Sequence, residues 1–118
     1  MIIVDKQEIT LTRGDTAYLR FIPLVKDYQT NTWVEKILEE GDRAFFRIKT
    51  NAATVLEKEC LVEIENNKVR LTIDPEDTIP LDFKTYYYEV ELVTNLDEHF
   101  TFIAHQRFTV GKEEELHG

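Results

Sequence analysis

The strongest constraint on this chain is an alternation of apolar and polar residues with a period of two, which recurs from end to end. A period of two places successive side chains on opposite faces of a β-strand, so that one face can be buried while the other meets solvent. The clearest example runs from Thr85 to Val93, and its inward-facing residues are Tyr86, Tyr88, Val90 and Leu92. The pattern predicts a chain built of β-strands.

Weaker alternation predicts further strands over Glu8–Thr12, Thr16–Pro23, Ala44–Lys49, Glu59–Glu65, Lys68–Asp74, Phe100–Ile103 and Gln106–Val110. Turn residues separate them: Gly14 provides backbone freedom, and Asn66-Asn67 suits a tight hairpin because asparagine tolerates positive φ. Pro75–Thr78 is predicted to form one helical turn, since proline suits the first helical position. The segment from Lys26 to Gly41 has no clear pattern, and a short strand, a helical turn or both are compatible with it.

Seven or eight short strands with turn signals every 8–12 residues or so, and no long amphipathic helix, favour two sheets packed face to face. We therefore expect an all-β, antiparallel immunoglobulin-like β-sandwich. A length of 118 residues suits a single domain. The domain is expected to cover residues 1–110, followed by a charged tail, residues 111–118, that we expect to be mobile.

Charge and composition exclude several classes of partner. The net charge is −9, and the 14 lysine and arginine residues are scattered, whereas nucleic-acid binding needs clustered basic residues. No apolar stretch approaches the roughly 20 residues that cross a bilayer, so no membrane partner is expected. The start of the chain lacks the basic head and apolar run of a signal peptide, and the single cysteine, Cys60, cannot form an intrachain disulfide. These features predict folding in a reducing cytosol.

The residues that could support catalysis are few. Serine is absent, and Cys60 stands at an inward position of a predicted strand, where a small buried residue is expected and a nucleophile is not. The histidines, at positions 99, 105 and 117, have no zinc-ligand spacing. The acidic residues at 74, 76 and 77 are too few for a calcium loop, and capping of the helical turn by Asp74 explains them more simply. We expect no enzymatic activity, no metal and no cofactor.

Four aromatic residues stand outside the predicted core: Tyr28, Trp33, Phe45 and Tyr87. Phe45 and Tyr87 have the opposite phase to their core neighbours, and Tyr28 and Trp33 lie in the polar segment after Lys26. Exposed aromatic residues often anchor protein–protein contacts. The alternative, that some of them cover an edge or open end of the sandwich, has equal weight.

Several segments, read in order, resemble a known family: Ile9–Thr16, Ala44–Ile48, Leu71–Thr78, Thr85–Leu92 and Gln106–Val110. They resemble small immunoglobulin-like domains of tail and baseplate proteins from phages and prophages of Gram-positive bacteria, with the N-terminal domain of the baseplate upper protein as the nearest named family. Two departures stand out: the Lys26–Gly41 segment is longer and more charged than the usual link, and Thr85 replaces a glycine.

The resemblance implies a virion structural protein that acts through protein–protein contacts, with virion components or further copies of itself as partners. Such a protein would occupy the bacterial host cytoplasm during assembly and then the virion. A competing hypothesis is a small acidic phage-encoded inhibitor of a host protein. Tyr86 follows the Pro75–Phe83 corner, where sandwich domains often carry a tyrosine that bonds to the corner backbone, and Tyr88 is expected in the core. Both roles are structural.

Overall fold

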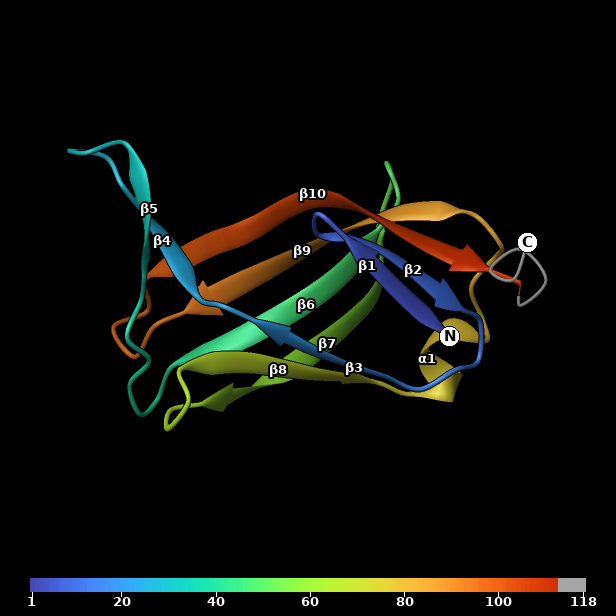
Figure 1. Ribbon diagram of the computed structural model, residues 1–118, viewed down its shortest axis with the longest axis horizontal. Helices are drawn as coiled ribbons and strands as arrows, with labels where there is room; N and C mark the ends of the chain where they lie inside the picture. Colours follow the sequence, from blue (N-terminus) through green and yellow to red (C-terminus); the bar gives the residue numbers. More distant parts are fainter. Residues whose placement is uncertain (113–118) are drawn as a thin grey trace.

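The computed structural model describes residues 1–112, which form ten β-strands and one helical turn (Figure 1). The elements are β1 (Ile2–Asp5), β2 (Glu8–Thr12), β3 (Ala17–Phe21), β4 (Leu24–Asp27), β5 (Thr32–Glu35), β6 (Arg43–Lys49), β7 (Thr54–Glu63), β8 (Lys68–Ile73), α1 (Pro75–Thr78), β9 (Thr85–Val93) and β10 (His99–Gly111). Residues 113–118, most of the predicted tail, lie outside the described residues.

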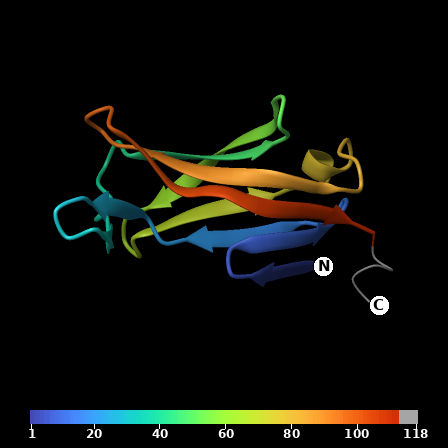
Figure 2. The same ribbon diagram turned by 90° about the horizontal axis from the view of Figure 1, so that it is seen from above.

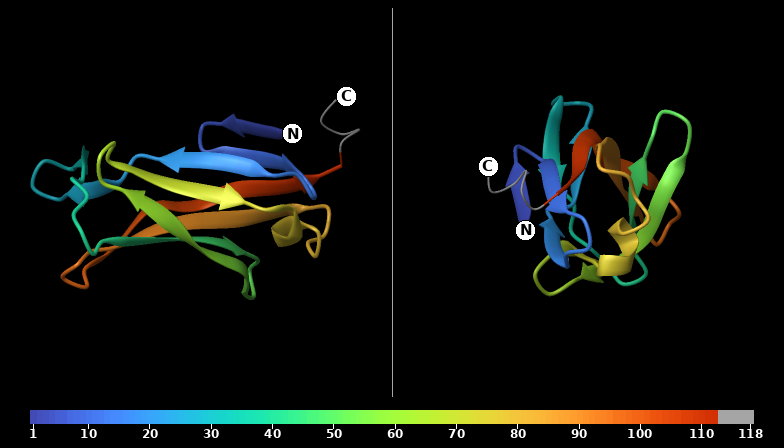
Figure 3. Two further views of the ribbon diagram at one scale, coloured as in Figure 1. Left: turned by 90° about the horizontal axis from the view of Figure 1, so that it is seen from below. Right: turned by 90° about the vertical axis from the view of Figure 1, so that its right-hand side faces the viewer.

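Eight strands form one curved sheet in the order β1-β2-β10-β9-β6-β7-β8-β3, while β4 and β5 form a separate two-stranded ribbon. Seen along its long axis, the large sheet curls almost into a barrel (Figure 3, right). Strand β7 turns the sheet, because its residues 54–60 pair with β6 and its residues 61–63 pair with β8. The curl brings the two ends of the sheet toward each other without pairing β3 with β1 or β2.

The prediction of an all-β fold is confirmed, but the sheet is mixed and not wholly antiparallel. Neighbouring strands of the large sheet run antiparallel except β2 and β10, which pair in parallel with Ile9 opposite Phe108. The parallel pair arises because the chain leaves β2 through a turn at Gly14, whose φ is +85°, and enters β3 on the other side of the seam. A glycine tolerates this backbone conformation without strain.

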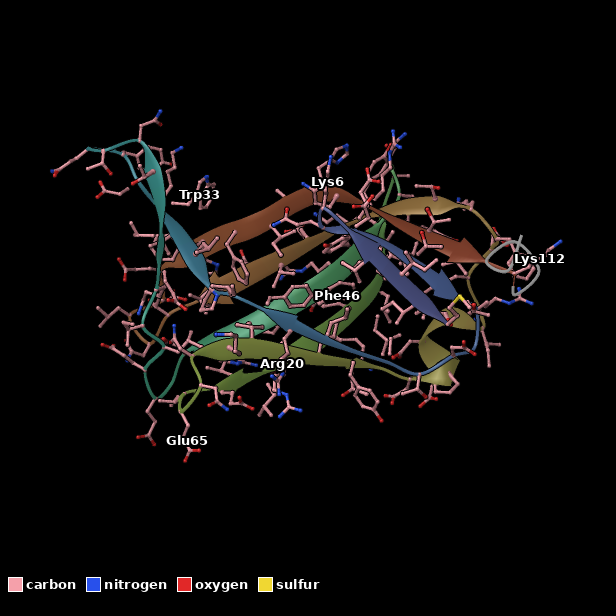
Figure 4. All side chains as sticks on the ribbon, viewed as in Figure 1. Lys6, Arg20, Trp33, Phe46, Glu65 and Lys112 are labelled. Atoms are coloured by element: carbon pink, nitrogen blue, oxygen red, sulfur yellow. The ribbon has the colours of Figure 1, made fainter. Side chains whose placement is uncertain are left out.

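The core is formed by the inward-facing residues of the alternating strands. Phe46 of β6 lies at its centre, with ring centroids 6.4 Å from Phe21, 5.4 Å from Tyr88 and 6.1 Å from Phe108 (Figure 4). These rings come from β3, β6, β9 and β10, so one aromatic cluster joins the edge strand β3 to three strands from which β7 and β8 separate it in the order of the sheet. Cys60 is buried at the inward position that the alternation predicts.

The unassigned Lys26–Gly41 segment contains part of the β4–β5 ribbon and a connection to β6 that side chains hold in place. The Asn67 amide donates to the Lys36 carbonyl (2.9 Å) and accepts from the Leu38 N–H (2.7 Å). The buried Asp42 carboxylate accepts from the Asn95 N–H (2.8 Å) and so links this connection to the β9–β10 turn. These contacts fix the base from which the ribbon extends.

Strand β1 and the start of β7 differ from the sequence-based expectation. β1 pairs with β2 through a turn in which Lys6 and Gln7 both have positive φ, 50° and 72°, although neither residue favours it. β7 begins at Thr54, earlier than predicted, and the sequence does not mark this start because Glu57, Lys58 and Glu59 interrupt the apolar alternation of its first half. Ile64 has the same phase as Cys60 in the predicted strand and is therefore expected to face inward, but it is 49% exposed because β7 ends one residue before it.

At its C-terminal end the ordered domain continues past the predicted boundary, since Gly111 is buried, pairs with Thr12 and belongs to β10. The prediction that the mobile tail begins at residue 111 is therefore wrong at that residue. The helical turn forms at Pro75–Thr78 as predicted, and the Asp77 carboxylate accepts the Asp74 N–H at 2.8 Å. At four residues, the helix in the described part of the chain is far too short to cross a membrane.

Candidate protein-interaction surface

Residues 24–35, which comprise β4, β5 and their turn, form an arm that extends beyond one end of the large sheet (Figures 1 and 2). Four cross-strand residue pairs connect its strands. The turn forms because Asp27 Oδ1 accepts hydrogen bonds from the N–H groups of Gln29 (2.9 Å) and Thr30 (3.4 Å), while Asn31 adopts a φ of 56°. Asparagine and aspartate favour such turns because their short side chains bond to nearby backbone.

Two of the four predicted surface aromatics lie on this arm. Trp33 lies on β5 (Figure 4). It is 51% exposed, and Tyr28, in the turn, is 87% exposed. Lys26 places its ammonium group 5.6 Å from the Trp33 ring centroid, over the face of the ring. Val34 beside it is also exposed. The arm therefore presents apolar and aromatic side chains that the described residues leave largely uncovered.

Phe45 lies elsewhere, on the outer face of β6, and is half-buried. The guanidinium carbons of Arg43 and Arg47 stand 5.0 Å and 5.7 Å from the centroid of its ring. Cation–π contacts of this kind stabilise a partly exposed ring by about 0.5–1 kcal/mol. The side chain faces outward as its phase predicts, but two arginines partly cover it.

Tyr87 is half-buried on the outer face of β9 and stacks on His105, with ring centroids 4.1 Å apart and planes within 6°. His105 reaches this position because β10 bulges there and the histidine adopts a φ of 55°. The stacked pair covers one face of Tyr87. This arrangement favours the alternative reading for Tyr87, in which the ring covers part of the protein itself.

The cross-strand register separates Phe45 from Tyr87. Phe45 lies opposite Glu91 and Tyr87 lies opposite Lys49, with the row of Arg47 opposite Glu89 between them. Phe45 and Lys49 are four residues apart on β6, and four residues of a strand span about 13 Å. The structure therefore brings Tyr28 and Trp33 together on the arm, and leaves Phe45 and Tyr87 apart from each other on a charged face.

The charged side chains of that face form ion pairs with one another. Arg47 contacts Glu57 (2.6 Å), Glu91 (3.2 Å) and Glu89 (3.6 Å), and the hydrogen bond to Glu57 is the largest cause that raises the pKa of Arg47. His99 lies 3.3 Å from both Glu91 and Asp97, which together raise the pKa of the imidazole. Charges that are already paired attract an external partner weakly.

The residues with catalytic potential show little sign of activation. Burial raises the pKa of Cys60 to about 12, so the thiolate that would act as nucleophile is scarce near neutral pH. Within residues 1–112, no group of three or more histidine, cysteine, aspartate or glutamate side chains is arranged to hold a metal ion.

The two tyrosines assigned structural roles make specific contacts. The Tyr86 hydroxyl accepts a hydrogen bond from the Asp82 N–H at 2.9 Å, which ties the start of β9 to the corner before it. The Tyr88 hydroxyl donates to the Gln7 carbonyl, and burial raises the pKa of Tyr88 to about 12. Tyr88 therefore joins the core to the turn between β1 and β2.

A groove along the seam of the near-barrel was not predicted. We define the seam groove as two adjoining cavities: one of about 360 Å³ between β2 and β3, and one of about 320 Å³ between β10 and the arm. The residues that line both cavities are Gln7, Leu24, Phe102 and Ile103. The adjacent apolar pair Phe102-Ile103, which breaks the alternation, is the local signal that could have marked it.

Comparisons of this chain with protein-family models, with curated proteins and with solved structures find no match. The resemblance to tail and baseplate domains therefore stays a prediction, and the function must be inferred from the surface just described.

Proposed function

We propose that this protein is a non-enzymatic protein-binding module, and that it serves as a tail- or baseplate-associated structural protein of a phage or prophage. The exposed arm with Tyr28 and Trp33 is the observation that carries the proposal. The resemblance of the strand motifs to baseplate domains suggests the biological setting. It also suggests that the sheet corresponds to an immunoglobulin-like sandwich whose two layers meet at β7.

The arm supports a binding role for an energetic reason. A two-stranded ribbon alone is marginally stable in water, because it has no second layer against which to bury its side chains. Here the ribbon holds Tyr28, Trp33 and Val34 exposed, at 87%, 51% and 42% of their surface. Tryptophan and tyrosine are the residue types most enriched among the side chains that dominate protein–protein binding energy. A partner protein that covers the arm would bury these side chains.

The test is an affinity pull-down of the tagged chain from a bacterial lysate after prophage induction, with the recovered proteins identified by mass spectrometry. We expect tail or baseplate proteins with the natural chain, and their loss with the double variant Tyr28→Ser, Val34→Ser, which removes two exposed side chains of the arm. The matched control is Ile79→Ser, Phe83→Ser, which removes two side chains of 57% and 40% exposure near α1, at the opposite end of the molecule (Figure 1). Equal recovery with all three proteins would refute a binding role for the arm.

The competing proposal, an acidic inhibitor of a host protein, draws support from the net charge of −9. Glu35, the last residue of the arm, and Glu40, which follows the arm in the chain, are both exposed, and neither forms an ion pair with the described residues. A binding surface of this kind would lose affinity as salt is added, because mobile ions screen exposed charges. Recovery of one host protein that is lost at high salt would favour the inhibitor, and sedimentation of the free chain would separate a monomeric inhibitor from a self-associating virion protein.

A further inference from the structure

The first half of β10 has a free edge. Strand β2 pairs with β10 only from Phe108 to Gly111, and no other strand of the described chain pairs with the same edge before Phe108, although β4 lies against β10 without pairing with it. On the opposite side, the pairing with β9 is interrupted by bulges, so that Phe102, Ala104 and His105 have no register partner there either. The backbone from Thr101 to Gln106 therefore keeps hydrogen-bonding groups that no strand satisfies.

The edge is free because the chain turns away from it. An extended continuation of β2 toward the N-terminus would run along β10, but Lys6 and Gln7, both with positive φ, fold the chain back into β1. The hydrogen bond from the Tyr88 hydroxyl to the Gln7 carbonyl holds this turn. The space beside β10 that an additional strand would fill is the seam groove.

The far wall of the groove is also a strand edge. Strand β3 is the last strand of the sheet and pairs only with β8, so its other edge has no strand partner in the described chain. Residues 18–22 and Leu24 line the groove from this side, and Tyr88 of β9 lines it as well. Buried backbone groups strongly favour hydrogen-bond partners, and an extended peptide can provide them on both of its edges.

The side chains around the groove are apolar, and the charges at its rims are positive. Arg20 is the single charged residue among those that line the groove, and Lys6 lies at the turn on the other side of the seam (Figure 4). Neither forms an ion pair with the described residues. Arg20 lies near enough to Glu63 for their charges to interact, but neither cation has a close ion-pair partner among the described residues. Two such cations on an otherwise acidic protein are complementary to an acidic side chain of a bound segment.

We propose that the seam groove binds an extended segment of a partner protein, which pairs with the free edge of β10 from Thr101 to Gln106 and thereby continues the sheet. A segment of about six residues, some 20 Å long, fits this edge. Its alternate side chains are apolar and face Leu24, Phe102 and Ile103, and an acidic residue lies near Arg20. An apolar small molecule fits less well, because it cannot satisfy the two strand edges.

This inference rests on the proposed function in that both require a protein partner, but it concerns a different surface. The arm variant described above changes Tyr28 and Val34, neither of which lines the groove, whereas a groove variant leaves both unchanged. Failure of one proposal is therefore distinguishable from failure of the other. Trp33 lines the groove and is the single tryptophan of the chain, so its fluorescence reports on groove occupancy.

The probe is a random octapeptide library displayed on phage and selected against the full chain. We expect the enriched peptides to share alternating apolar positions and an acidic residue. A synthetic copy should shift the Trp33 emission to shorter wavelength and slow the hydrogen exchange of amides 101–106 and 19–22 by about tenfold or more. Absence of enrichment, or slowed exchange confined to other strands, would overturn the proposal.

Matched variants locate the binding. Leu24→Asp puts a charge into the apolar groove and should weaken the peptide Kd by about tenfold or more, whereas Leu96→Asp makes the same change at a 78% exposed leucine outside the groove and should leave the Kd unchanged. Arg20→Glu should weaken binding of the acidic peptides, and Lys84→Glu, with the same change in charge, should not. Equal affinity for all four variants would refute a site in the groove.

Two other occupants are tested directly. Sedimentation that shows a dimer of the natural chain and a monomer of Leu24→Asp would make a second copy the occupant and overturn the assignment to another protein. Titration with a fluorescent fatty acid that shifts the Trp33 emission, in the absence of any enriched peptide, would make the groove a lipid site and also overturn the proposal.

Discussion

Replacing Tyr88 by alanine removes the largest side chain that the core buries completely. Its ring lies 5.4 Å from that of Phe46 and 6.3 Å from that of Phe108, measured between centroids, so alanine would leave a cavity between β6, β9 and β10. Truncation of a buried aromatic residue to alanine reduces the free energy of unfolding by about 3–5 kcal/mol. A domain of this size is stable by about 5–15 kcal/mol in total, so the loss is a large fraction of the whole.

The Tyr88→Phe variant separates the hydroxyl from the ring. It removes the hydrogen bond to the Gln7 carbonyl, and we expect a loss of about 1 kcal/mol because Gln7 is exposed and water can take over the bond. A third variant, Tyr18→Ala, is the control, since Tyr18 is 76% exposed on β3 and its loss should change stability by no more than about 0.5 kcal/mol.

Urea denaturation followed by far-ultraviolet circular dichroism gives the three free energies. Circular dichroism is preferable to fluorescence because Trp33 lies on the arm and reports poorly on the core. A loss below about 1 kcal/mol for Tyr88→Ala would mean that its ring is not packed as described. A loss for Tyr88→Phe equal to that for Tyr88→Ala would assign the stabilisation to the hydroxyl and contradict the cavity argument.

Three further predictions concern ionisable groups. Burial raises the pKa values of Tyr88 and Cys60 to about 12. The ordinary pKa values are about 10 for tyrosine and 8.5 for cysteine, and below them the two neutral side chains contribute their full stabilisation to the fold. This stabilisation is lost as the pH rises from the ordinary values toward 12, because the unfolded chain then loses these protons first. Urea denaturation at several alkaline pH values should show the decline, and Tyr88→Phe combined with Cys60→Ala should reduce it. The pKa of His99, measured by NMR titration, should lie above that of a free histidine and decrease in Glu91→Gln; an unchanged value would refute the contact. Asp42→Ala leaves two backbone N–H groups without their acceptor and should lower the free energy of unfolding by about 1–3 kcal/mol, whereas Asp42→Asn, which keeps an acceptor oxygen, should lose less.

The parts of the fold that sequence could predict are those in which local pattern and burial agree. The strand from Thr85 to Val93 matches β9 residue for residue, because its inward positions are apolar or aromatic and its outward positions are mostly polar. The helical turn at Pro75–Thr78 was equally predictable, since proline and the acidic residues that follow it favour the first turn of a helix. Cys60 was placed inward for the same reason and is buried.

Strand pairing was not predictable in the same way. The parallel pair of β2 and β10 joins Ile9 to Phe108, and no local pattern specifies which distant strand becomes a neighbour. The arm was missed because its apolar residues are exposed, so that alternation carries no information about a buried face. Strand β1 was missed because Lys6 and Gln7 are not residues that usually form a tight hairpin.

The candidate surface shows the same division. The alternation predicts that Phe45 and Tyr87 face outward, but only the cross-strand register shows that Arg47 and Glu89 separate them. The seam groove depends on which strands fail to pair, a property of the whole sheet that no single segment contains.

The arm and the seam groove have one physical explanation in common. The arm lacks a layer to pack against, and the first half of β10 lacks a strand at its edge, yet Leu24 and Trp33 of the arm line the same groove as Phe102 and Ile103 of β10. A segment bound in the groove would contact both, and would thereby attach the arm to the large sheet. We therefore expect nitrogen-15 relaxation to show larger picosecond-to-nanosecond motion for the arm amides than for those of β6 in the free protein, and a decrease of that motion when a groove-binding peptide is added. Arm amides as rigid as those of β6 before the peptide is added would contradict this coupling, because the arm would then need no partner to become ordered.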